Sequence, residues 1–138
     1  MQINPYLNFN GDCADAFRLY ERVLGGRIEA MMTHRDSPMA DKVSPASLDR
    51  ILHARLVVGD QVLMGSDAPP EYPQAAGNMY VSVQIDDVAD AERIFGALAE
   101  NGTVQMPFQA TFWAKGFGML IDRFGIPWIV NAGQAAAS

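Results

Sequence analysis

Apolar and polar residues alternate through the first ten positions, which predicts a strand with one buried face. The spacing then changes, because apolar residues from Asp12 to Leu24 recur at intervals typical of a helix. Gly25-Gly26 supplies the expected helix stop. Residues 27–33 indicate a second strand, and residues 53–66 indicate a hairpin that turns at Gly59.

The segments between these elements are predicted to be loops. Residues 34–50 contain two prolines and mixed charge without a clear period. Residues 68–77 are rich in proline and are interpreted as a linker. We therefore assign residues 1–67 to a first module.

The second half of the chain repeats this order. Alternation resumes at Met79, and a helix is expected to begin at Asp87, which follows Asp12 at an offset of 75 residues (87 − 12 = 75). This helix should stop at Asn101-Gly102, and a hairpin should turn at Asp122 to Gly125. Each half thus reads as strand, helix, strand, strand, strand, which indicates a duplication. The second module is assigned to residues 78–133, with residues 134–138 as a tail.

The duplication predicts an α+β fold made of two βαβββ modules. One helix covers only one face of a sheet, so the two modules should share their uncovered faces in a cupped mixed sheet with the helices outside. The resulting cleft is the candidate site. It would form either within one chain or between two chains.

Composition limits the range of partners. The chain has 138 residues, of which 49% are hydrophobic, so it can bury the core of one soluble domain. Its formal charge of −6 disfavours nucleic acids and anionic membrane surfaces. Neither a membrane span nor a signal peptide is recognised, so a cytoplasmic location is expected. The single cysteine, Cys13, has no nearby histidine in sequence to act as its base.

Several motifs resemble those of the PhnB-like branch of the vicinal oxygen chelate superfamily, and the resemblance spans nearly the whole chain. The motifs are Asn4-Pro5-Tyr6-Leu7, Phe9-Asn10-Gly11, Tyr20, Val23-Leu24-Gly25-Gly26, Gly59 to Met64, Thr111-Phe112-Trp113-Ala114, Asp122-Arg123-Phe124-Gly125 and Trp128. The superfamily includes glyoxalase I, extradiol dioxygenases and bleomycin and fosfomycin resistance proteins. The resemblance implies paired βαβββ modules and a homodimer. Proteins of this branch are often labelled methyltransferases, but the chain lacks the glycine-rich strand-to-helix turn of an adenosyl-cofactor site.

The resemblance also locates the four positions that hold a divalent metal in other superfamily members. They fall at Pro5, between Leu63 and Gly65, at Tyr80 and at Ile129. Proline and isoleucine side chains donate no electron pair and tyrosine is a rare ligand, so we expect no such metal site. Family spacing directs Pro5 into the cleft, whereas the alternation directs Asn4, Tyr6 and Asn8 there. We favour the alternation, because a helix packed on asparagines would bury unpaired polar groups.

His53 is the candidate catalytic residue. It lies on a predicted strand with Arg55 on the same face, and it is either an ordinary strand histidine or an acid–base group. His34 opens the polar loop and is most simply solvated. The aromatic residues Trp113, Phe117 and Trp128 are either core residues or a stacking surface for a ligand. The full set of expected ligand-binding residues is Tyr6, Asn8, Arg55, Met64, Tyr80, Ser82, Gln84, Trp113, Phe117 and Trp128.

Three functional hypotheses follow. The preferred one is a protein that binds a small organic molecule in an aromatic-lined cleft without the usual superfamily metal, as the resistance-type relatives sequester ligands. The second is a lyase, isomerase or dioxygenase-type enzyme in which His53 is an acid, a base or a metal ligand. The third is a dimer with a filled cleft and no ligand.

Overall fold

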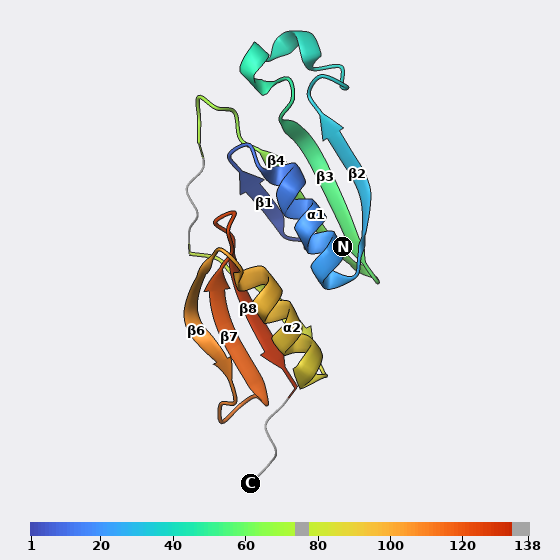
Figure 1. The fold of residues 1–138 in the computed structure, drawn as a ribbon. Helices are drawn as coiled ribbons and strands as arrows, with labels where there is room; N and C mark the ends of the chain where they lie inside the picture. The colour runs from blue at the N-terminus through green and yellow to red at the C-terminus, as the bar shows by residue number, and fades with distance from the viewer. Residues whose placement is uncertain (74–77, 134–138) are drawn as a thin grey trace. The chain divides into compact units, whose positions relative to one another are not determined.

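A computed structural model describes residues 1–73 and 78–133. The chain divides into two compact units, Met1–Ala75 and Ala76–Ser138. In each unit one helix lies on one face of a four-stranded mixed sheet (Figure 1). The predicted linker is described only through residue 73, and the predicted tail lies outside the described residues.

The first unit has the element order expected from the sequence. Its elements are β1 (Tyr6–Phe9), α1 (Cys13–Leu24), β2 (Arg27–Thr33), β3 (Ile51–Val58) and β4 (Gln61–Asp67). The strand order is β1-β4-β3-β2, with β1 parallel to β4 and the other pairs antiparallel. The long loop between β2 and β3 contains two short 3₁₀ turns, Ala40–Lys42 and Pro45–Ser47.

The second unit repeats this topology. Its elements are β5 (Val81–Ile85), α2 (Val88–Ala99), β6 (Thr103–Gln109), β7 (Gly116–Ile121) and β8 (Pro127–Ala132). The strand order is β5-β8-β7-β6, and β5 is parallel to β8. The two βαβββ modules predicted from the duplication are therefore confirmed. Neither described helix is long and apolar enough to cross a membrane.

Local sequence signals set the helix ends. Gly25 follows α1 in the left-handed conformation, with a φ of 74°, where a side chain would be strained. The Asp87 carboxylate accepts the backbone N–H of Asp90 and so caps the start of α2. Asn101, with a φ of 61°, follows α2 and turns the chain toward β6. The predicted helix boundaries are thus confirmed.

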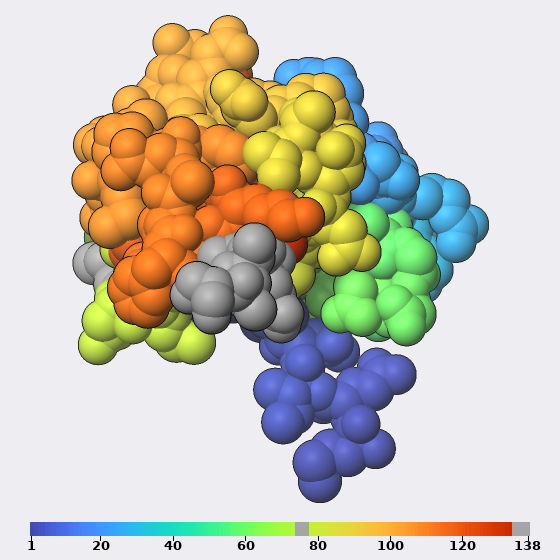
Figure 2. Space-filling view, turned by 90° about the horizontal axis from the view of Figure 1, so that it is seen from below, coloured from blue at the N-terminus to red at the C-terminus, as the bar shows by residue number. Residues whose placement is uncertain are grey.

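The first strand is shorter than the alternation of residues 1–10 predicts. The ladder with β4 begins at Tyr6, and Pro5 adds only its carbonyl oxygen, which accepts the N–H of Met64. Proline has no N–H with which to extend the ladder. The residues before β1 project outward, as the dark blue segment of Figure 2 shows, and the Met1 and Ile3 side chains are exposed.

Each unit has its core between its helix and its sheet. In the first unit the Phe9 and Phe17 rings meet edge to face, with a centroid separation of 6.1 Å, and both are buried. In the second unit Leu98 of α2 is buried together with Trp128 and Val130 of β8. Within β1, Tyr6 and Asn8 are exposed whereas Phe9 is buried, as the alternation predicts. The same alternation turns Ile3 toward the helix, but Ile3 precedes β1 and is exposed.

Candidate functional site

Each sheet has a second face, opposite its own helix, which we call its helix-free face. On β3, Ala54 and Leu56 are buried, whereas His53 and Arg55 are half-buried and lie on the helix-free face. Paired residues of neighbouring strands project to the same side of a sheet. Arg55 pairs with Met64, and Met64 pairs with Tyr6, so these three expected site residues form one row across β3, β4 and β1.

His53 and Tyr6 contact each other across this face. The Tyr6 hydroxyl lies 3.2 Å from His53 Nδ1, and the two rings are stacked with centroids 5.9 Å apart. The residues come from β3 and β1, which are separated by β4, so the contact passes over the intervening strand. The tautomer of His53 decides which group donates the hydrogen bond. A phenol and an imidazole at this distance can share a proton.

Arg55 extends the polar surface of the first sheet toward β2. Its Nε donates to Glu29 Oε1 at 3.0 Å, and both side chains are partly exposed. An ion pair in contact with water adds little stability. Asn8 is exposed on the same side as Tyr6, where it pairs with Ser66 of β4. The helix-free face of the first sheet therefore combines ionisable and neutral polar groups.

The helix-free face of the second sheet carries a row of aromatic and carboxamide side chains. Phe117 of β7 pairs with Asn131 of β8, which pairs with Gln84 of β5. Asn131 Nδ2 donates to Gln84 Oε1 at 2.7 Å, and Gln84 Nε2 donates to the Ser82 hydroxyl at 3.2 Å. These hydrogen bonds fix the side chains of Ser82 and Gln84, two of the expected site residues, in one connected network.

One atom of this network has no partner. Asn131 Oδ1 is buried and accepts no hydrogen bond within the described part of the chain. A buried carbonyl oxygen that lacks a donor costs about 1–3 kcal/mol of stability. Asn131 was not among the residues expected from the sequence, although it shares its face of β8 with Ile129. Because this atom is buried, an incoming N–H or O–H group would reach it only if the Asn131 or Gln84 side chain moved.

Trp113 adds an aromatic surface beside this row. Its ring meets the Phe117 ring nearly edge to face at 5.1 Å, and the Phe112 ring meets Trp113 at 4.7 Å. Trp113 is 44% exposed and Phe112 is 89% exposed. Their loop is held by Thr111, whose backbone N–H donates to the Ala114 carbonyl and whose hydroxyl accepts the Ala114 N–H. Trp113 and Phe117 thus lie together, as the binding hypothesis requires.

Trp128 lies on the other side of the sheet, which corrects its inclusion among the ligand-binding residues. It is 1% exposed, and its Nε1 donates to the buried Asp122 carboxylate at 2.9 Å. Residues on β8 alternate in facing, so Trp128 and Val130 pack toward α2 while Ile129 and Asn131 face the opposite way. The two tryptophans therefore occupy different environments.

Tyr80 bridges the two edges of the second sheet. It lies just before β5, and its hydroxyl donates to Gln105 Oε1 of β6 at 2.8 Å. β5 and β6 are the opposite edge strands, so this hydrogen bond spans the helix-free face over β8 and β7. Sequence reasoning did not single out Gln105, because nothing in the linear pattern connects residues of two edge strands.

The residues at the superfamily metal positions do not fit a divalent ion. On the helix-free face, Met64 occupies the second position and Ile129 the fourth, while Tyr6 and Tyr80 are the nearest donors at the first and third. A thioether and an aliphatic side chain supply no oxygen or nitrogen ligand. Within residues 1–73 and 78–133, no three His, Cys, Asp or Glu side chains lie close enough to hold a metal.

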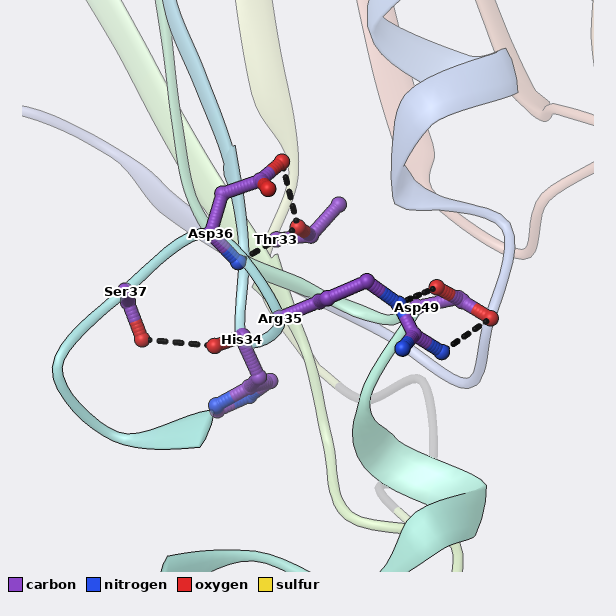
Figure 3. A network of polar contacts seen from close by, with 6 residues as sticks. All are labelled: Thr33, His34, Arg35, Asp36, Ser37 and Asp49. Atoms are coloured by element: carbon purple, nitrogen blue, oxygen red, sulfur yellow. Dashed lines mark hydrogen bonds and ion pairs between the residues drawn. The ribbon is translucent and has the colours of Figure 1, made fainter. Parts of the chain in front are cut away.

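The loop between β2 and β3 is held by local polar contacts (Figure 3). Arg35 binds Asp49 through two hydrogen bonds, of 2.8 and 3.3 Å, and these bonds together with the guanidinium charge lower the pKa of Asp49. The Ser37 hydroxyl donates to the His34 carbonyl at 2.8 Å. His34 was expected to be solvated, yet its Nδ1 is buried without a partner among the described residues. No expected site residue takes part in the contacts of this loop that Figure 3 shows.

Comparison with known proteins identifies the class to which this fold belongs. The structure matches that of protein PA1353 from Pseudomonas aeruginosa with a TM-score of 0.91 and 50% identity, covering 97% of this chain and 98% of that chain. It also matches the structure of a protein from Bacillus cereus described as a putative 3-demethylubiquinone-9 3-methyltransferase, PhnB protein. The TM-score is 0.79 and the identity 21%, and the match covers 96% of this chain and 100% of that chain. The chain therefore has the fold of these two proteins.

The family itself follows from the sequence match. The family model described as 3-demethylubiquinone-9 3-methyltransferase matches residues 1–131, and the chain belongs to this family. Protein YjdN from Escherichia coli strain K12 is 33% identical over 139 residues, which cover 95% of each chain. The family match spans nearly the whole chain, as the motif resemblance predicts.

Proposed function

We propose that this protein binds a small organic molecule on the helix-free faces of its sheets and that it does so without the usual superfamily metal. The observation that carries the proposal is the row of Phe117, Asn131 and Gln84, with Trp113 beside it. Exposed aromatic rings next to a polar network combine apolar contact area with hydrogen-bonding groups.

Tryptophan fluorescence tests the binding proposal directly. Trp113 is half-exposed and Trp128 is buried, so a ligand that stacks on Trp113 should change its emission saturably. The wild-type protein is titrated with a panel of metabolites, and Trp113→Phe should lose the response while retaining the emission of Trp128. A panel that produces no saturable change, in fluorescence or in thermal stability, contradicts the proposal and favours a filled site.

The metal part of the proposal has its own test. Protein purified without added metal is analysed for metal content. We expect far less than one divalent ion per chain, because Met64 and Ile129 stand where ligands are needed. One tightly bound divalent ion per chain overturns this part of the proposal.

A second candidate function is an enzyme of the lyase, isomerase or dioxygenase type. The contact between Tyr6 and His53 favours it, because a phenol next to an imidazole is suited to proton transfer. His53→Ala should abolish such an activity in glyoxalase and dioxygenase assays while leaving thermal stability nearly unchanged, since His53 is only half-buried and Tyr6 is exposed. His34→Ala is the matched control. An activity that survives His53→Ala contradicts the role of His53.

We also propose that the protein acts as a homodimer in the cytoplasm, as its superfamily resemblance and composition suggest. Light scattering coupled to gel filtration should then give twice the chain mass of 15.1 kDa. A mass of one chain at micromolar concentration contradicts the dimer. Methyl transfer is not proposed, because the turns that precede the helices, residues 10–12 and 86–87, are not glycine-rich.

A further inference from the structure

The two sheets differ in charge. β5, β6, β7 and β8 contain no Asp, Glu, Lys, Arg or His. The first sheet, in contrast, carries Arg27, Glu29, His53, Arg55 and Asp67. The strand residues on the helix-free face of the second sheet are therefore all neutral, and two ionisable residues, Lys115 and Asp86, lie just outside β7 and β5.

The strand register orders this face into three rows. The first row holds Ile121 and Pro127 and lies nearest the bridge between Tyr80 and Gln105. The second row is apolar at its centre, where Met119 pairs with Ile129, and it ends at Ser82. Its central pair is half-buried.

The third row is polar on both sides of an aromatic ring. It runs from Gln109 through Phe117 and Asn131 to Gln84, so three carboxamides flank one phenyl group. Each carboxamide presents both a donor and an acceptor. Trp113 lies against Phe117 at the end of this row. The apolar pair of the second row, the aromatic ring and the carboxamides of the third row thus lie next to one another on the same face.

A charged ligand is disfavoured on such a surface. Removing a charge from water against Met119, Ile129 and Phe117 costs free energy that only a counter-charge or several hydrogen bonds offset. The strands supply no counter-charge, and the two ionisable residues at their border, Lys115 and Asp86, carry opposite charges. A neutral carboxamide loses much less on desolvation, and its N–H and C=O groups can hydrogen-bond with the exposed carboxamides of Gln84 and Gln109.

We propose that the helix-free face of the second sheet selects an uncharged aromatic ring that carries a carboxamide or an equivalent donor–acceptor edge. This inference rests on the proposed function and names the ligand class of the same site. The ring would stack against Phe117 and Trp113, and its polar edge would meet Gln84 or Gln109.

Three probes of nearly the same shape test the charge selectivity. Benzamide is neutral, benzoate is an anion and benzamidine is a cation at pH 7. Each is titrated into the full chain labelled with ¹⁵N, and the side-chain NH₂ signals of Gln84, Gln109 and Asn131 report binding at this face. We expect benzamide to bind roughly tenfold more tightly than either charged probe, a ratio that corresponds to about 1.4 kcal/mol.

The two charged probes also distinguish the local effect of this face on affinity from the effect of the protein's net charge. The formal charge of −6 attracts a cation and repels an anion everywhere on the surface. If the net charge determines the relative affinities, benzamidine will bind most tightly, benzamide less tightly and benzoate least tightly. That order overturns the inference.

A matched pair of variants adds a second readout. Gln84→Glu places one charge in the third row and should raise the affinity for benzamidine relative to benzamide by roughly tenfold. Gln61→Glu makes the same chemical change on an exposed residue of the first unit and should leave the ratio unchanged. Equal effects of the two variants overturn the inference.

The outcomes distinguish this inference from the proposed function. If the metabolite panel yields a ligand but benzoate or benzamidine binds this face as well as benzamide, the inference fails and the binding function stands. If none of the three probes shifts the three side-chain signals, the face is covered by another part of the chain or by a second copy, and the inference fails. A panel without any ligand contradicts the proposed function itself.

Discussion

The indole Nε1 of Trp128 donates a hydrogen bond to the carboxylate of Asp122 across the turn that joins β7 to β8. The distance from Nε1 to Oδ2 is 2.9 Å, and the two residues are 1% and 3% exposed. The other oxygen, Oδ1, accepts the backbone N–H groups of Phe124 and Ile126 at 2.9 and 3.0 Å. One buried carboxylate therefore fixes both the turn and the start of β8.

Replacing Trp128 should destabilise the protein strongly. Trp128→Phe removes a donor from a buried carboxylate and leaves a cavity, so we expect a loss of roughly 2 to 4 kcal/mol in the free energy of unfolding. The loss is measured by urea unfolding, with circular dichroism as the signal. Trp113→Phe is the matched control and should change stability by less than about 0.5 kcal/mol. Comparable losses in the two variants would show that the Asp122 contact is not what stabilises this hairpin.

Two glycine-to-alanine substitutions should act in opposite directions. A Cβ at Gly65 of β4 would lie 2.8 Å from a ring carbon of Phe17 and 2.9 Å from the Leu7 carbonyl oxygen. Gly65→Ala should therefore cost about 1–3 kcal/mol through overpacking. A Cβ at Gly96 of α2 meets nothing within 4 Å, so Gly96→Ala should add about 0.5–1 kcal/mol through helix propensity. Thermal melts of both variants check the signs, and a neutral Gly65→Ala would contradict the close helix packing.

Asp67 ties three segments of the first unit together. Its Oδ1 accepts the N–H groups of Gly11 and Cys13, and its Oδ2 accepts the N–H of Ile51. Asp67→Asn replaces one acceptor with an NH₂ group that faces a donor, so we expect a loss of roughly 2 to 4 kcal/mol by chemical denaturation. Asp60→Asn, in the exposed hairpin turn, should cost less than about 0.5 kcal/mol. If both variants unfold at the same urea concentration, the buried carboxylate does not have this role.

Cys13 should make the protein less stable at alkaline pH. Burial, reinforced by the charges of Asp67 and Asp12, raises the pKa of its thiol above the ordinary value of 9.0. Above pH 9 the unfolded chain ionises the thiol and the native protein does not, so unfolding releases a proton. This thiol alone should lower the free energy of unfolding by up to about 1.4 kcal/mol per pH unit above pH 9, with no contribution below it.

The Cys13→Ala variant isolates that contribution from other alkaline groups. Its stability should fall less steeply than that of the wild type between pH 9 and 10.5, measured by urea unfolding at each pH. The native thiol should also resist alkylation at pH 8 and react only after unfolding. Identical pH slopes in the two proteins would contradict a raised thiol pKa.

The candidate site was only partly predictable from the sequence. Tyr6, Asn8, Ser82 and Gln84 were placed correctly on one side of their strands, because side chains on a strand alternate. Trp128 was grouped with Trp113 because both are aromatic and close in sequence. Asn131 and Gln105 were not singled out, because their roles depend on partners in strands that are distant along the chain.

The sequence by itself determined the elements, the duplication and the family. Helix periodicity, the glycine stop after α1 and the aspartate caps act within a few residues, so a linear pattern carries them. The tertiary structure decided which of those residues meet. Parallel pairing of β5 with β8 sets Gln84 beside Asn131, and it turns Trp128 toward α2 while Ile129 faces the other way. Strand order and register arise from packing between distant segments, and for that reason only the folded sheet shows which carboxamides lie beside Phe117.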